Sequence, residues 1–249
     1  MCLSCIISSQ NQPSFSAQRR KALGLFASAG LFGTGVLTPS TYASTPPKPA
    51  NSLNPEEALG RLMAGNQRYV DGTASAKDFA STRLQLSTGQ NPYACILGCA
   101  DSRVGPEFCF DETRGDLFVN RVAGNYVTTD LLASMEYAIA VLGTPLIMVL
   151  GHTQCGAVKA AIDAYQNETD FPGHIQSITT ALMPAVKIAQ TSGSPDLLDA
   201  ATRQNILNNV AVLTNSTPIL RKHVREGKLA VVGGLYHLDT GRVEVLKNT

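Results

Sequence analysis

Short apolar runs mark the strands that the sequence predicts. Each run is rich in Val, Ile, Leu or Ala and almost free of charge, a composition typical of strands buried on both faces of a sheet. The runs cover Ala94–Leu97, Leu117–Asn120, Leu146–Leu150, Leu229–Leu235 and Val243–Leu246. A turn sequence, Asp239-Thr240-Gly241, separates the last two runs and predicts a hairpin.

Helical patterns lie between these runs. The first predicted helix follows Asn54, because Asn54-Pro55-Glu56-Glu57 supplies an N-cap, a proline at the first helical position and two acids in the first turn. Further helices are expected at 129–142, 155–165, 174–189, 200–214 and 218–226. Strands alternating with helices predict an α/β fold, with a mainly parallel β-sheet flanked by helices and one antiparallel edge strand. Functional groups in such sheets collect at the carboxyl ends of the strands.

The amino-terminal residues read as a targeting segment. Gln18-Arg19-Arg20-Lys21 precedes a mildly apolar stretch rich in Gly and Ala, and small residues at 41 and 43 suit cleavage after Ala43. The paired arginines make residues 1–43 similar to a twin-arginine export signal. We therefore expect export to a periplasm or an equivalent lumen. Residues 44–54 are rich in Pro, Ser and Asn and read as a linker, which leaves 55–249 as one domain.

Composition and charge exclude several functional classes. Charged residues make up 16% of the chain and the formal net charge is +1. Removing 1–43 takes away three basic residues and no acidic one, which leaves 17 basic residues against 19 acidic. Nothing in this balance indicates a nucleic acid or an anionic membrane as partner. The mature part also lacks the long uncharged apolar stretch of a membrane span.

The cysteines raise a chemical question. Cys2 and Cys5 fall in the predicted signal, so the mature chain keeps four: Cys95, Cys99, Cys109 and Cys155. Four cysteines in a chain of this size do not form a disulfide framework. Thiols in an oxidising compartment then need burial or a metal to protect them. Cys95 and Cys109 are expected to be buried structural thiols.

Two polar motifs follow predicted strands. Cys99-Ala100-Asp101-Ser102-Arg103 comes after the first strand, and Gly151-His152-Thr153-Gln154-Cys155 comes after the third. If the two strand ends meet, the two thiols and the imidazole form a Cys₂His set with one open position, which is typical of catalytic zinc. Taken singly, a buried cysteine or a hydrogen-bonded structural histidine would be the plainer interpretation. The residues taken together, with Asp101 and Arg103 beside them, favour the metal site.

These motifs resemble the β-class carbonic anhydrases over most of the mature chain. The resemblance rests on CADSRVGPE (99–107), GDLFVNRVAGN (115–125), SMEYA (134–138), LGHTQCGAV (150–158) and GGLYHLDTGRV (233–243). It implies that Cys99, His152 and Cys155 bind one Zn²⁺ per subunit and that Asp101 and Arg103 form a dyad beside it. It also implies reversible hydration of CO₂ to bicarbonate and a proton by attack of zinc-bound hydroxide, and a homodimer or a multiple of dimers.

The resemblance further implies a substrate pocket of the plant-type branch. Gln90 matches a glutamine that hydrogen-bonds substrate, and Phe118 and Tyr137 match pocket-lining residues, one of which often reaches across the dimer. Ala123 stands where that branch usually has valine, which widens the pocket. A bidentate pair with Arg103 is expected to hold Asp101 off the zinc and keep the site open.

The sequence is also compatible with other functions. A hydrolase of carbon disulfide or carbonyl sulfide on the same fold would use the same metal and dyad. A non-catalytic zinc- or bicarbonate-binding protein would have Asp101 closing the site. A thiol oxidoreductase is disfavoured, because the mature chain has no Cys-x-x-Cys. His174, His223 and His237 are candidates for proton transfer by residue type alone.

Overall fold

The computed structural model describes residues 52–246, so the predicted export signal and most of the predicted linker lie outside the described residues. The helices are α1 (Pro55–Val70), α2 (Arg83–Leu86), α3 (Pro106–Cys109), α4 (Thr129–Ala140), α5 (Gly156–Gln166), α6 (Ile175–Thr191), α7 (Leu197–Asn215) and α8 (Ile219–Arg225). The strands are β1 (Ala94–Gly98), β2 (Leu117–Arg121), β3 (Leu146–His152), β4 (Ala230–Tyr236) and β5 (Val243–Leu246). Among the described helices, none combines the length and apolar character that crossing a membrane requires.

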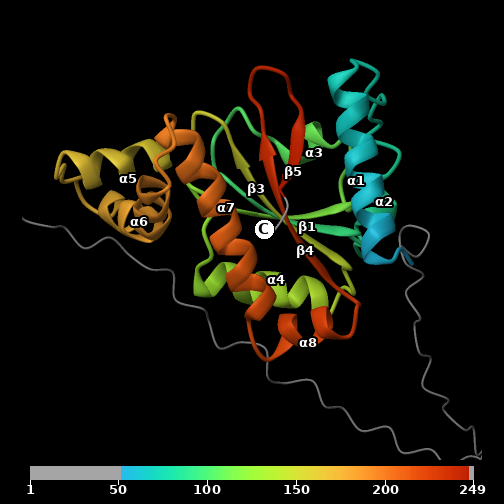
Figure 1. Ribbon diagram of the computed structural model, residues 1–249. Helices are drawn as coiled ribbons and strands as arrows, with labels where there is room; N and C mark the ends of the chain where they lie inside the picture. The colour runs from blue at the N-terminus through green and yellow to red at the C-terminus, as the bar shows by residue number, and fades with distance from the viewer. Residues whose placement is uncertain (1–51, 247–249) are drawn as a thin grey trace, which may run out of the picture. The chain divides into compact units, whose positions relative to one another are not determined.

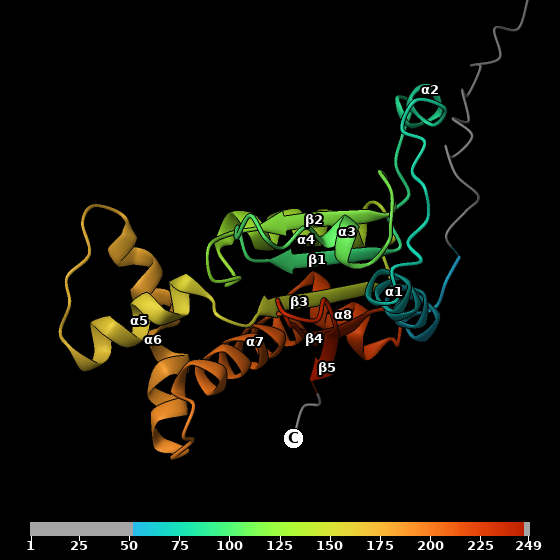
Figure 2. The same ribbon diagram turned by 90° about the horizontal axis from the view of Figure 1, so that it is seen from above.

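One sheet organises the domain and confirms the predicted fold class. The strand order is β2-β1-β3-β4-β5, and β1 to β4 run parallel while β5 pairs antiparallel with β4. Figure 2 shows the strands side by side in this order. Every residue of β1 and β3 is buried, as their continuous apolar sequences predict.

Side chains of the central strands alternate between two cores. Ala94 and Ile96 of β1 face a core shared with α1 and α3, whereas Cys95 and Leu97 face a core shared with α4, α7 and α8. This alternation follows from the two-residue period of a strand. A third core, built from α5, α6 and the start of α7, includes Cys99 and Cys155. Figure 2 shows α5 and α6 on the side toward which β1 and β3 point.

Helix α7 lies very close to the sheet because glycines face it. A Cβ at Gly233 would come within 2.8 Å of the Ile206 side chain, and one at Gly151 within 2.6 Å. Any larger residue on the strands would therefore push the helix away. Figure 1 shows α7 running from the neighbourhood of α6 down to α8. The glycines of β3 and β4 thus set how near this helix comes to the carboxyl ends of the strands.

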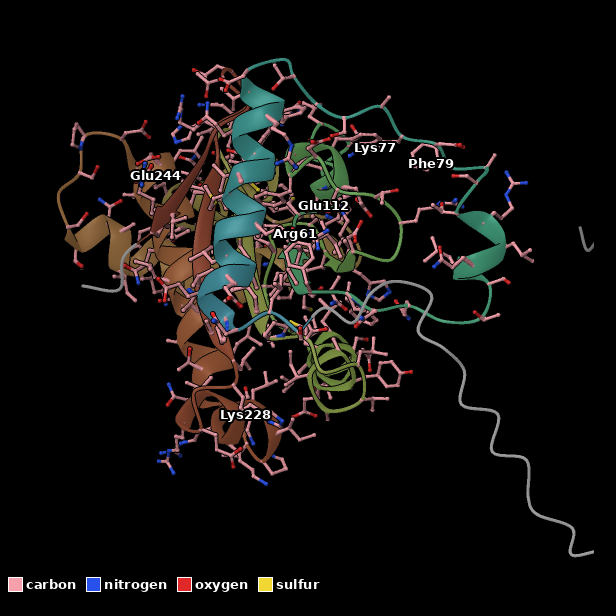
Figure 3. All side chains as sticks on the ribbon, turned by 90° about the vertical axis from the view of Figure 1, so that its right-hand side faces the viewer. Arg61, Lys77, Phe79, Glu112, Lys228 and Glu244 are labelled. Atoms are coloured by element: carbon pink, nitrogen blue, oxygen red, sulfur yellow. The ribbon has the colours of Figure 1, made fainter. Side chains whose placement is uncertain are left out.

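Helix α1 is fastened to the domain by polar contacts at two levels. Arg61 makes a two-point bond to Glu112, with Nε to Oε1 at 3.1 Å and Nη2 to Oε2 at 2.9 Å. Figure 3, viewed from the side of α1, labels both side chains. The buried Asn66 donates to the carbonyls of Cys109 and Gly241, both at 2.9 Å, and accepts from the N–H of Val243 at 2.8 Å. One side chain thereby links α1, α3 and the β4–β5 hairpin.

Replacing Asn66 with alanine is expected to lower the free energy of unfolding by about 2–4 kcal/mol. The substitution leaves three buried backbone groups without partners, and each unsatisfied group costs about 1–3 kcal/mol before the structure relaxes. Chemical denaturation measures the change. Gln67→Ala is the matched control, because Gln67 is exposed and, among the described residues, its side chain hydrogen-bonds only to Asp71 four residues on. That variant should stay within about 0.5 kcal/mol of the parent, and an equal loss in both would contradict the proposed role of Asn66.

Candidate metal centre

The predicted meeting of two strand ends is confirmed. Gly98, the last residue of β1, pairs with Leu150 of β3, so Cys99 begins its loop beside the end of β3. Strand β3 continues two residues further than expected and includes His152, which pairs with Tyr236 of β4. The ligand atoms of Cys99, His152 and Cys155 all lie within 4.8 Å of one another. Residues up to 56 positions apart in the chain, Cys99 and Cys155, thus belong to one buried cluster.

The ring of His152 is oriented for binding a metal. Its Nδ1 lies 2.9 Å from the carbonyl oxygen of Thr153, so Nδ1 carries the proton and donates. Nε2 then has a free lone pair, and it is buried without a hydrogen-bond partner among the described residues. Thr153 is itself held, because its N–H donates to Tyr236 O at 2.9 Å and its Oγ1 accepts from Leu238 N at 3.1 Å. A metal at Nε2 would satisfy this orphaned atom.

The two thiols favour a soft cation. The hydrogen bond from Cys155 lowers the pKa of the Cys99 thiol, and the same contact with Cys99 raises the pKa of Cys155. Two thiolates this close repel each other, and a divalent cation between them would remove that repulsion. The N–H of Gly124 also donates to Cys99 Sγ at 3.3 Å. Cys₂His with one open position is a donor set that fits Zn²⁺.

The other cysteines lie outside this cluster. Burial raises the pKa of Cys95 to about 12 and that of Cys109 to about 11. Cys95 packs in the core between the sheet and α4, and Cys109 packs in the core beneath α1. Both are free and buried, which confirms their interpretation as buried thiols.

Asp101 and Arg103 form a two-point ion pair beside the cluster. Arg103 Nε donates to Asp101 Oδ1 at 2.9 Å and Nη2 donates to Oδ2 at 2.7 Å, while the Arg103 backbone N–H also donates to Oδ1 at 2.9 Å. These bonds from Arg103 hold the pKa of Asp101 well below its usual range. Asp101 Oδ2 lies only 3.7 Å from His152 Nε2. The carboxylate is therefore near the metal position but occupied by the guanidinium.

Arg121 supports this loop and was not identified from the sequence. Its Nε donates to Cys99 O at 2.8 Å, and Nη2 donates to Asp101 O and to Val104 O, both at 2.7 Å. One guanidinium at the end of β2 thus fixes three carbonyls of the loop that carries Cys99 and Asp101. The sequence could have indicated Arg121 by its position at the end of the second predicted strand. In a parallel sheet that end lies beside the end of the first strand, where the motif with Cys99 begins.

The four expected pocket residues do not gather at the cluster within one chain. Gln90 is exposed before β1, beside Arg114 and Gly115, at the opposite end of that strand from Cys99. Phe118 pairs with Cys95 inside the sheet, and its ring lies 6.3 Å from that of Tyr137 on α4. Ala123 directly precedes Gly124, the donor to Cys99. Of the four, only Ala123 adjoins a residue that contacts the cluster.

The three remaining histidines have local partners. His223 Nδ1 lies 2.9 Å from Ile219 O one helical turn earlier, and His237 Nε2 lies 3.4 Å from Glu244 Oε2. His174 is exposed at the start of α6. None of these contacts reaches the cluster, so proton transfer by any of the three stays a prediction.

Comparison with known proteins gives one consistent result. A family model described as carbonic anhydrase matches residues 94–243. Carbonic anhydrase 2 of Mycobacterium tuberculosis is 38% identical over 192 residues, which are 77% of this chain and 92% of that protein. Two solved structures share 30% identity and a TM-score of 0.60 over 76% of this chain: the β-carbonic anhydrase CcaA, covered to 95%, and the Coccomyxa β-carbonic anhydrase in complex with acetazolamide, covered to 86%.

Proposed function

The chain belongs to the β-class carbonic anhydrases. We propose that its Cys99, His152 and Cys155 hold the zinc. In this proposal Asp101 hydrogen-bonds the reacting water, and Arg103 holds Asp101 in place. Its activity is the reversible hydration of CO₂ to bicarbonate and a proton, with Zn²⁺ as cofactor. The observation that supports the residue assignment is the buried cluster of two sulfurs and one unpartnered imidazole nitrogen at adjoining strand ends. That is the chemistry of a zinc ligand set with a vacancy.

Each residue has a separate task in this proposal. A zinc ion held by the cluster would lower the pKa of a bound water to about 7 and so would supply a nucleophile near neutral pH. His152 presents Nε2 because Thr153 holds the proton on Nδ1. Asp101 stays ionised near neutral pH, since the bonds from Arg103 hold its pKa low, and Oδ2 can accept a hydrogen bond from the reacting water or hydroxide. Arg103 keeps both carboxylate oxygens engaged.

We also propose that the site is open near neutral pH. A carboxylate oxygen 3.7 Å from His152 Nε2 is near enough to become a fourth metal ligand after a small movement. The two charge-assisted bonds from Arg103, at 2.9 Å and 2.7 Å, oppose that movement. This geometry supports the open-site, plant-type assignment made on Gln90.

Stopped-flow CO₂ hydration tests the proposal, using zinc-loaded protein made from residues 44–249. Fast hydration at both pH 7.5 and pH 9 is the expected result. Activity at pH 9 alone would mean that Asp101 closes the zinc near neutrality, and the open-site assignment would be wrong. Zinc-loaded protein without hydration at either pH would contradict the residue assignment. Turnover of carbon disulfide or carbonyl sulfide would then identify the alternative hydrolase.

A homodimer, or a multiple of dimers, is part of the proposal. Gln90, Phe118 and Tyr137 can serve as pocket residues only if a second copy brings them near the cluster, since one chain does not. Tyr137 is 48% exposed and Phe108 is 72% exposed, so large apolar side chains are available on the surface for such contacts. Sedimentation of residues 44–249 should give a mass of at least two chains, and a monomer would exclude a shared pocket.

Export is proposed on the sequence of residues 1–43. Zinc can be loaded before translocation if the route carries folded proteins, as the twin-arginine route does, and loading protects the thiols. The chain with Arg19→Lys and Arg20→Lys should accumulate inside the cell, which fractionation and immunoblotting would measure. Normal export of that double variant would rule out the twin-arginine route.

A further inference from the structure

Two asparagines on α7 are buried although the helix packs on an apolar core. Asn205 is 3% exposed and Asn209 is 7% exposed, and their neighbours Ile206 and Val210 are fully part of the core beneath the sheet. A buried carboxamide destabilises the fold unless its N–H and C=O groups are hydrogen-bonded. Their partners therefore indicate why these residues are polar.

The partners are backbone groups of the turn 122–127, which follows β2. Asn205 Nδ2 donates to Gly124 O at 2.8 Å, and Asn209 Oδ1 accepts from Val127 N–H at 2.8 Å. Asn209 Nδ2 also donates to Asn205 Oδ1 at 3.0 Å and to Asn205 O at 2.8 Å. The two side chains are thus hydrogen-bonded to each other and to two backbone groups of the turn.

This turn needs such support. Gly124 has φ +86° and Asn125 has φ +42°, two successive left-handed residues of which the second is not a glycine. A Cβ at Gly124 would come within 2.8 Å of Leu182, so the turn is also pressed against α6. Backbone conformations of this kind persist where the surroundings hold them in place.

The turn also contacts the metal centre. Gly124 is the residue whose N–H donates to Cys99 Sγ at 3.3 Å, while its carbonyl is the group bonded by Asn205. A change in the orientation of this residue would therefore move the donor away from the sulfur. Hydrogen bonds to a metal-bound ligand fix its direction and adjust its affinity for the metal.

We propose that Asn205 and Asn209 are positioning residues for the zinc ligand Cys99. They act through the turn 122–127, whose Gly124 N–H they keep directed at the Cys99 sulfur. The hydrogen bonds of the two carboxamides go to Gly124, to Val127 and to each other, so the effect passes through the backbone of the turn. The proposal rests on the proposed function, because it assumes that Cys99 is a ligand of zinc.

The test replaces Asn205 with leucine, which keeps the branch at Cγ, is larger, and has no hydrogen-bonding groups. The zinc dissociation constant, measured by competition with a chromophoric chelator, should rise about 10-fold or more. In the cobalt-substituted protein, the sulfur-to-metal charge-transfer band should shift, because one sulfur loses its N–H donor. A purely structural role for Asn205 would lower the unfolding midpoint and leave that band in place.

Asn208→Leu is the matched control on the same helix. Asn208 is only partly buried and its Oδ1 accepts from Gln204 Nε2 one turn earlier, so zinc affinity and the cobalt band should match the parent. If the leucine variant at 205 does not fold, Asn205→Ser provides the same measurements with a smaller side chain. Parental zinc affinity together with a parental cobalt band in a folded 205 variant would overturn the proposal. Equal zinc loss in the 208 variant would overturn it as well. Failure of the unsubstituted chain to bind zinc would instead refute the proposed function.

Discussion

The Cys155→Ser variant is expected to lose its zinc and with it all measurable CO₂ hydration. Serine keeps the shape of cysteine but does not ionise near neutral pH, so the metal loses one of two thiolates. Removing only a hydrogen-bond partner of a metal ligand lowers metal affinity by up to about 100-fold. Because this substitution removes a ligand itself, the zinc dissociation constant should rise by more than that. Metal analysis after gel filtration and stopped-flow hydration measure the two effects.

This substitution should separate metal binding from folding. Cys155 is the N-cap of α5, and serine is among the best N-cap residues, so the helix is not weakened. Cys95→Ala is the control, because that buried thiol lies outside the cluster and in a different core. It should retain one zinc per chain despite lower stability. Full zinc occupancy in Cys155→Ser would show that the ligand set has been assigned wrongly.

The Arg103→Ala variant is expected to keep its zinc but to lose at least about 100-fold in kcat/KM at pH 7.5, comparable to removing an electrostatic group from an active site. Without the guanidinium, both oxygens of Asp101 lose their charge-assisted donors. Oδ2, already 3.7 Å from His152 Nε2, is then free to move to the metal and block it. The loss should be smaller at pH 9, where hydroxide competes better with the carboxylate.

A double substitution tests this explanation directly. If Arg103 acts by restraining Asp101, then adding Asp101→Ala to the Arg103→Ala protein should cost much less than Asp101→Ala costs in the parent. Arg103→Lys should fall between the parent and the alanine variant, because lysine keeps the charge but not the two-point geometry. Independent, additive losses from the two alanine substitutions would contradict the restraining role.

Local sequence patterns were sufficient for most of the fold. The strands were predicted within two residues of their ends, because uninterrupted apolar runs in an α/β protein have few alternatives to a buried strand. The short helices α2 and α3 were not predicted, since four residues are too few to show a helical period. Helix α7 begins at Leu197, three residues before its predicted start, where Asp196 caps it. Strand β3 runs on to His152 because β4 pairs with it there, which is a long-range interaction.

The sequence by itself determined the identity of the candidate ligands. Two cysteines and a histidine that follow predicted strands can be recognised as a metal-binding set from residue type and position alone. Only the tertiary structure decided how those groups are used. The proton on His152 Nδ1, the support of the loop by Arg121 and the grip of α7 on the turn at Gly124 all depend on hydrogen bonds between backbone and side-chain atoms. Asn205 and Gly124 are 81 positions apart, and no local periodicity records a bond of that kind. Such contacts exist only after the chain has closed on itself.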